Sequence, residues 1–162
     1  KQIRKQLMAQ FETVVLPKKW LFVSSLPLTT QGKINRQLLQ QLVSLDTKRF
    51  PQVLSYEIQD EYSVLTLQVS EKLVYFEGHF PEQPILPGVT QLAWVEEFGK
   101  ILFNIDKPFL CMEVIKFKKI IPPETQINLK LNWKSEISKL YFDMSSSEGA
   151  HSSGRMVYGV QP

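Results

Sequence analysis

Residues 75–100 read YFEGHFPEQPILPGVTQLAWVEEFGK, a proline-rich loop followed by an apolar helix. Each proline fixes its own φ and pushes the preceding residue toward extended geometry, so residues 80–86 are expected to form a rigid loop. From Gly88 onward the apolar residues recur at helical spacing, at Val89, Leu92, Ala93, Val95, Phe98 and Ile101. The stretch therefore predicts a buried or nearly buried helix that begins directly after Pro87.

The start of this helix and the histidine of the loop together suggest a site for proton transfer. Pro87 tolerates a helix start, so the amides of Gly88 and Val89 are expected to point out of the helix N-terminus. A helix N-terminus attracts developing negative charge. His79 stands at the entrance of the loop, where it could move a proton next to a polarised carbonyl.

The run GHFPEQPILPGV (78–89) resembles the signature GHFPxxPxxPGV of the hotdog-fold 3-hydroxyacyl-(acyl carrier protein) dehydratases. More narrowly, LPGVTQLAW resembles the ApeI-type dehydratases of aryl polyene biosynthesis. The resemblance implies a lyase that converts a 3-hydroxyacyl thioester into a trans-2-enoyl thioester in fatty acid or aryl polyene biosynthesis. By this resemblance His79 is the general base and acid, and the Gly88 amide polarises the thioester carbonyl. It also implies an apolar acyl slot lined by Phe80, Leu86, Val89 and Trp94.

One position departs from the family pattern. The family carries a carboxylate on the helix where this chain has Ala93, and an alanine cannot protonate a leaving hydroxyl. Glu96 or Glu97 could project near the same helix face, or they could be ordinary solvated residues. Alternatively Gln91 could bind the hydroxyl, or His79 could perform both proton transfers.

The resemblance also implies partners. The acyl group would arrive on the phosphopantetheine arm of an acyl carrier protein, and no further cofactor is expected. Carrier proteins are acidic, so Lys116, Lys118 and Lys119 are candidate docking residues, with a plain charged strand face as the alternative. The family forms dimers with the active site at the interface, which implies a homodimer or higher homo-oligomer in the cytoplasm.

Two other functions stay open at this stage. A hotdog thioesterase would use water as the nucleophile and a positioned carboxylate, for which Glu96 or Glu97 is available. A catalytically silent hotdog domain would bind acyl carrier protein or dimerise a fused ligase, and Ala93 favours this interpretation.

Composition sets further limits. The 162 residues are 43% hydrophobic and 22% charged, which is enough for one core and a small annex. We expect no membrane span, no signal peptide, no nucleic-acid partner and no metal site. The single cysteine, Cys111, lies in an apolar run and is expected to be a buried structural thiol. His151 lies in a Ser/Gly-rich stretch that predicts a mobile loop.

The first 50 residues differ from the rest in charge, with nine Lys or Arg against two acids. Their pattern predicts a helix, a short strand at 20–23, a turn and a second helix at 37–45. The turn, LPLTTQGKINR (26–36), resembles the last motif of the adenylate-forming enzymes, LPxTxxGKIxR. By this resemblance Lys33 would contact the carboxylate and the adenylate phosphate, but it would be idle here because the ATP-binding sequence is missing. We therefore expect residues 1–45 to be the C-terminal tail of an upstream AMP-ligase fused to the dehydratase, in a chain that is a piece of something longer.

The remaining sequence reads mainly as strands. Residues 46–51 are expected to form a linker, and residues 52–162 a hotdog dehydratase-like domain. Strands are predicted at 53–58, 62–69, 109–118, 126–133, 139–145 and 155–160, with a break at 146–154. Strands followed by one helix and then by more strands predict an α+β fold, an antiparallel sheet wrapped around a central helix, preceded by a small α/β remnant.

Overall fold

The computed structural model of the chain describes residues 2–17, 21–23, 26–28, 31–58, 62–77 and 83–160. Its helices are α1 (Gln2–Met8), α2 (Arg36–Ser44) and α3 (Gly88–Phe103), with short 3-10 turns at Thr13–Val15 and Val74–Phe76. Its strands are β1 (Phe22–Val23), β2 (Gln52–Ile58), β3 (Ser63–Gln68), β4 (Phe109–Phe117), β5 (Gln126–Lys134), β6 (Lys139–Ser146) and β7 (Gly149–Tyr158).

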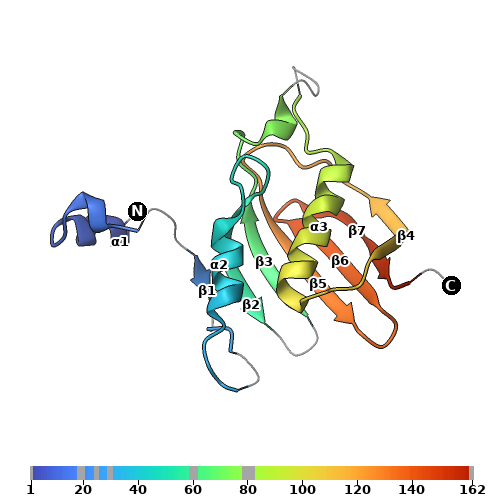
Figure 1. Cartoon of the computed structure of the whole chain (residues 1–162). Helices are drawn as coiled ribbons and strands as arrows, with labels where there is room; N and C mark the ends of the chain where they lie inside the picture. Colours follow the sequence, from blue (N-terminus) through green and yellow to red (C-terminus); the bar gives the residue numbers. More distant parts are fainter. Residues whose placement is uncertain are drawn as a thin grey trace.

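The strands form one sheet in the order β1-β2-β3-β5-β6-β7-β4. β1 pairs in parallel with β2, and the other neighbouring strands are antiparallel. α3 lies across one face of the sheet, and β4 forms one of its edges (Figure 1). The prediction of an α+β architecture with an antiparallel sheet around a central helix is therefore confirmed.

The core lies between α3 and the sheet. Trp94 and Phe98 of α3 are fully buried, and they share one apolar cluster with Leu65 and Leu129 of the sheet. Gly99 lets the helix approach β6 closely, because a Cβ at this position would collide with the Leu140 side chain. Burial of each large apolar side chain contributes about 1.5–3 kcal/mol to the stability of the fold. This packing fixes the position of α3, and with it the start of the helix.

α2 belongs to the same core, and residues 46–51, predicted to be a linker, form a turn that packs on α3. Leu38 and Leu42 of α2 are buried in the apolar cluster that contains α3. In the turn, the Arg49 carbonyl accepts a hydrogen bond of 2.9 Å from Trp94 Nε1. The Phe50 ring also meets the Phe98 ring edge to face at 6.4 Å. Residues 36–51 thus pack directly on the predicted dehydratase domain.

The loop that carries Lys33 precedes α2. An isolated bridge joins Leu28 to Ile34, and the Asn35 amide donates to the Pro27 carbonyl at 2.7 Å. Gly32 has φ +74°, a left-handed conformation that glycine adopts at little cost. Lys33 is exposed on this loop. The described residues of 26–36 agree with the predicted turn, residues 29–30 lie outside the described residues, and the origin in a ligase stays a prediction. Within the described part of the chain, no helix is long and apolar enough to cross a membrane.

Two predictions about single residues are wrong. His151 is only 1% exposed and lies in β7, which begins at Gly149 rather than at residue 155. Its ring nitrogen Nε2 forms a 2.8 Å hydrogen bond with Ser146 Oγ. The stretch is therefore an ordered strand and not a mobile loop. Small residues suit this strand because a Cβ at Gly154 would collide with the Ile115 side chain of β4. Cys111 is exposed rather than buried, because among the described strands β4 lies at an edge of the sheet and pairs with β7 alone.

Candidate active site

The start of α3 presents two backbone amides that donate to no described residue. Pro87 is the N-cap residue, and its carbonyl accepts hydrogen bonds from the Thr90 amide at 3.1 Å and the Gln91 amide at 3.2 Å. Within the described residues, the amides of Gly88 and Val89 donate no hydrogen bond. The first amides of a helix carry partial positive charge. This end of a 16-residue helix can therefore bind an oxygen that gains negative charge.

Leu86 holds the chain in place just before the helix. Its amide donates to the Ile121 carbonyl at 2.8 Å, and its carbonyl accepts from Gln91 Nε2 at 3.4 Å. Its side chain is buried in the core. Because both backbone groups and the side chain are fixed, the direction of the Gly88 amide is set before any ligand arrives, which is what electrostatic stabilisation of a transition state requires.

Gln91 has one polar group to spare. The side chain is 3% exposed, and its Oε1 accepts no hydrogen bond from the described residues. A buried amide oxygen without a donor is costly, so this atom can take a hydrogen bond from a water molecule or a hydroxyl group. The prediction that Gln91 could bind a hydroxyl is compatible with this geometry and stays a prediction.

The other predicted site residues fall into three groups. His79 and Phe80 lie in residues 78–82, outside the described residues. Val89 is 77% exposed beside Gly88 at the helix start. Trp94, in contrast, has no exposed surface and donates to the Arg49 carbonyl, so in this protomer it supports the helix from the core.

Of the two carboxylates that follow Ala93 on α3, Glu96 already has a partner. Ala93 is exposed, one turn after Val89. Glu96 forms a 2.6 Å ion pair with Lys100, the next turn away from the helix start. Burial raises the pKa of the Tyr158 phenol, and the negative charge of Glu96 raises it further. Glu96 is therefore engaged further along the helix, as expected for an ordinary helix residue.

The predicted docking lysines differ in their surroundings. Lys119 forms an ion pair with Glu148 at 3.5 Å and donates to the Glu148 carbonyl at 2.8 Å. Lys116 and Lys118 are exposed at the end of β4, in no ion pair with another described residue. Of the three predicted docking lysines, Lys116 and Lys118 would therefore be the more accessible to an acidic partner.

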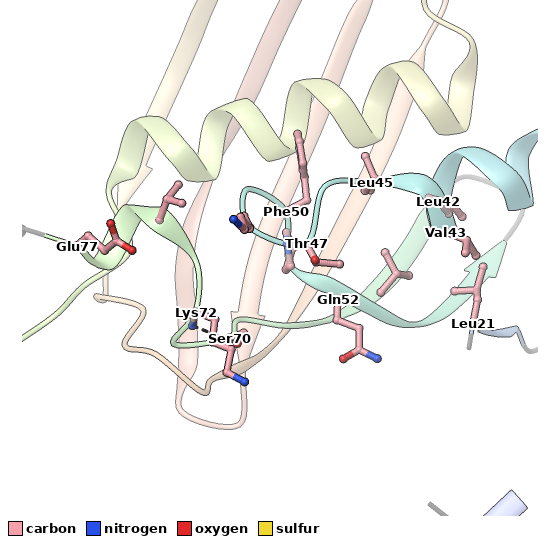
Figure 2. A pocket seen from close by; sticks show the side chains of 14 residues that line it. Leu21, Leu42, Val43, Leu45, Thr47, Phe50, Gln52, Ser70, Lys72 and Glu77 are labelled. Carbon is pink, nitrogen blue, oxygen red and sulfur yellow. Dashed lines mark hydrogen bonds between the residues drawn. The ribbon is translucent and has the colours of Figure 1, made fainter. Parts of the chain in front are cut away.

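A separate cavity of about 640 Å³ lies between α2, the start of β2 and the turn at 70–77. Figure 2 shows Glu77 at one end of this cavity, and Leu21 and Leu42 at the other. Glu77 directly precedes residues 78–82, but none of the predicted site residues lines the cavity. No sequence pattern indicates this cavity, because its walls come from segments that are distant along the chain.

An antiparallel sheet around one helix, with a site at the start of that helix, defines a hotdog-fold domain. The profile of the ApeI-like family, described as ApeI dehydratase, matches residues 55–155, which is more than half of the chain. The chain therefore belongs to the ApeI-like family.

Known relatives agree with this assignment. A 3-hydroxyacyl-[acyl-carrier-protein] dehydratase FabZ of Tolumonas auensis is 30% identical over 121 residues, covering 65% of this chain and 80% of that protein. The dehydratase heterocomplex ApeI:P of Xenorhabdus doucetiae aligns with a TM-score of 0.59 and 29% identity, covering 63% of this chain and 90% of that one. An uncharacterized protein of Erwinia carotovora subsp. atroseptica aligns with a TM-score of 0.56 and 38% identity, covering 63% of this chain and 87% of that one.

Proposed function

We propose that this chain dehydrates a 3-hydroxyacyl thioester on an acyl carrier protein to the trans-2-enoyl thioester, in fatty acid or aryl polyene type biosynthesis. The observation that carries the proposal is the start of α3, where the Gly88 and Val89 amides have no partner among the described residues. Membership in the ApeI-like family and the likeness to FabZ support the same reaction.

In this mechanism the Gly88 amide donates to the thioester oxygen. The α-proton is then acidic enough for neutral His79 to remove it, because the negative charge that develops on the oxygen is stabilised. The bond between the β-carbon and its hydroxyl breaks as the double bond forms. Since position 93 is an alanine, His79 returns the proton to the departing hydroxyl, which leaves as water.

The acyl chain would lie in an apolar slot formed by Phe80, Leu86 and Val89, with Trp94 packed behind it. An apolar slot with few polar groups at its reacting end is typical of such sites. The buried side chain of Leu86 and the exposed side chain of Val89 are compatible with this arrangement. Lys116 and Lys118 would attract the acidic carrier protein.

A second protomer would complete the assembly. β4 is an edge strand, and exposed edges of this kind pair readily with another chain. Large apolar side chains are exposed along and just after it, which marks an interaction surface. They are Met112, Val114 and Ile120. These features support a homodimer or higher homo-oligomer.

A catalytically silent domain is the second candidate, and Ala93 is the observation that favours it. Such a domain would bind acyl carrier protein or dimerise a fused ligase without turning over substrate. In either case residues 1–45 would be the tail of an adenylate-forming ligase, an idea that rests on the LPxTxxGKIxR motif with Lys33.

One experiment distinguishes a dehydratase from a catalytically silent domain. The protein is incubated with 3-hydroxyacyl-carrier-protein substrates of several chain lengths, and the ultraviolet absorbance of the enoyl thioester is followed. A dehydratase produces this absorbance, whereas a silent domain leaves the substrate unchanged. Release of the free acid would instead indicate a thioesterase. Lys33→Ala serves as the control variant and is expected to behave like the wild type.

A further inference from the structure

A bulge in β4 turns the end of this strand toward α3. Glu113 pairs with Arg155 and Lys116 pairs with Ser153, so β4 contains one more residue than β7 between these two pairs. Val114, inside the bulge, has φ +55°, which a β-branched residue rarely adopts. Bulges re-aim side chains and are frequent near active sites.

The consequence of the bulge is a change of face for Phe117. Before the bulge, Glu113 accepts hydrogen bonds from Lys139 Nζ and Arg155 Nε on the sheet face away from α3. After it, Phe117 pairs with Ser152, which pairs in turn with the fully buried Met144. Side chains alternate along a strand, so Phe117 would face away from α3 without the extra residue.

The Phe117 ring reaches the start of α3. A Cβ built on Gly88 would lie 2.7 Å from Cζ and 2.9 Å from Cε1 of Phe117, distances that real Cβ atoms do not show. Cα–Cβ bonds in a helix tilt toward its N-terminus, so the ring lies at the end of the helix toward which the Gly88 amide points. Phe117 is nevertheless 53% exposed, which leaves part of its ring open to a ligand.

We propose that Phe117 is a specificity-determining residue, which forms the wall beside the thioester bound at Gly88 and excludes acyl groups that branch at the α-carbon. This inference rests on the proposed function of the site. A thioester oxygen would lie about 3 Å from the Gly88 nitrogen, which brings the carbonyl carbon and its two substituents against the ring. Of these substituents only the α-carbon can carry a branch, so a wall at this place selects for α-unbranched 3-hydroxyacyl groups.

The test compares an unbranched 3-hydroxybutanoyl thioester with its 2-methyl counterpart, both on the same carrier protein. Wild type is expected to favour the unbranched substrate by about tenfold or more in kcat/KM, since one misplaced methyl group costs this much in a tight pocket. Phe117→Ala is expected to bring the ratio close to one. Phe109→Ala, on the same strand but packed on Tyr158, is the matched control and keeps the wild-type ratio.

Binding of unreactive amide analogues of the two substrates, measured by calorimetry, separates this inference from the proposed function. If wild type shows no turnover but still prefers the unbranched analogue, and Phe117→Ala loses the preference, the inference stands and the dehydratase function fails. An unchanged ratio in folded Phe117→Ala, an equal change in Phe109→Ala, or no binding of either analogue to wild type would overturn the inference.

Discussion

Replacing Trp94 by Phe should destabilise the protein substantially. Trp94 has no exposed surface and joins α3 to the turn at 46–51 through its 2.9 Å hydrogen bond with the Arg49 carbonyl. Losing this hydrogen bond costs about 1 kcal/mol. The missing part of the ring leaves a gap in the core, which adds about 1–2 kcal/mol, less than the roughly 3–5 kcal/mol for Trp→Ala. The free energy of unfolding is therefore expected to fall by about 2–3 kcal/mol.

Urea denaturation followed by circular dichroism measures this change. For a chain of this size the corresponding fall in Tm is about 5–10 °C. Trp133→Phe is the matched control, because Trp133 is only partly buried, and it is expected to cost less. A loss below about 0.5 kcal/mol for Trp94→Phe, or one equal to the control, would refute the description of the 46–51 turn as part of the core.

Three further predictions concern other residues. Gly99→Ala should cost about 1–3 kcal/mol in urea denaturation because its Cβ collides with Leu140; no loss would mean that α3 does not pack so closely on β6. Gly88→Ala should lower kcat/KM at least tenfold with little loss of stability, since the new Cβ occupies space beside the thioester site and displaces the exposed Phe117 ring; unchanged kinetics would contradict this. Hydrogen bonds from Lys139 and Arg155 lower the pKa of Glu113. The stabilisation by this ion pair is therefore present at neutral pH and is lost as the pH falls below the ordinary Glu pKa of about 4.3. The urea midpoints of wild type and Glu113→Gln should thus differ at pH 7 and converge at pH 3, and a constant difference would argue against this ion pair.

Most of the fold could be predicted because burial of one face leaves a clear pattern. The alternation in β3 and β5 reflects complete burial of every second residue, such as Leu65, Leu67 and Leu129. β7 was missed at its start because Ser152 and Gly154 carry little apolar signal. Gly154 fits this strand because it leaves room for the Ile115 side chain, a contact that depends on the pairing of distant strands.

The candidate site could also be predicted only in part from local sequence patterns. The motif around Gly88 identified the helix start, since proline and glycine at a helix N-terminus have a local cause. Phe117 could not be recognised, because its contact with Gly88 requires one extra residue in β4 relative to β7. No local pattern distinguishes an aromatic residue before such a bulge from one after it. Long-range register, rather than side-chain type, decides which residues join the site.

The proposed reaction depends most directly on His79. Mass spectrometry of a 3-hydroxyacyl-carrier-protein substrate, incubated with wild type and with folded His79→Ala, tests it in one comparison. The account predicts that the substrate loses the mass of one water with wild type and stays intact with the variant. Equal loss of water with both proteins would contradict the role of His79, and no loss with wild type would contradict the dehydratase itself.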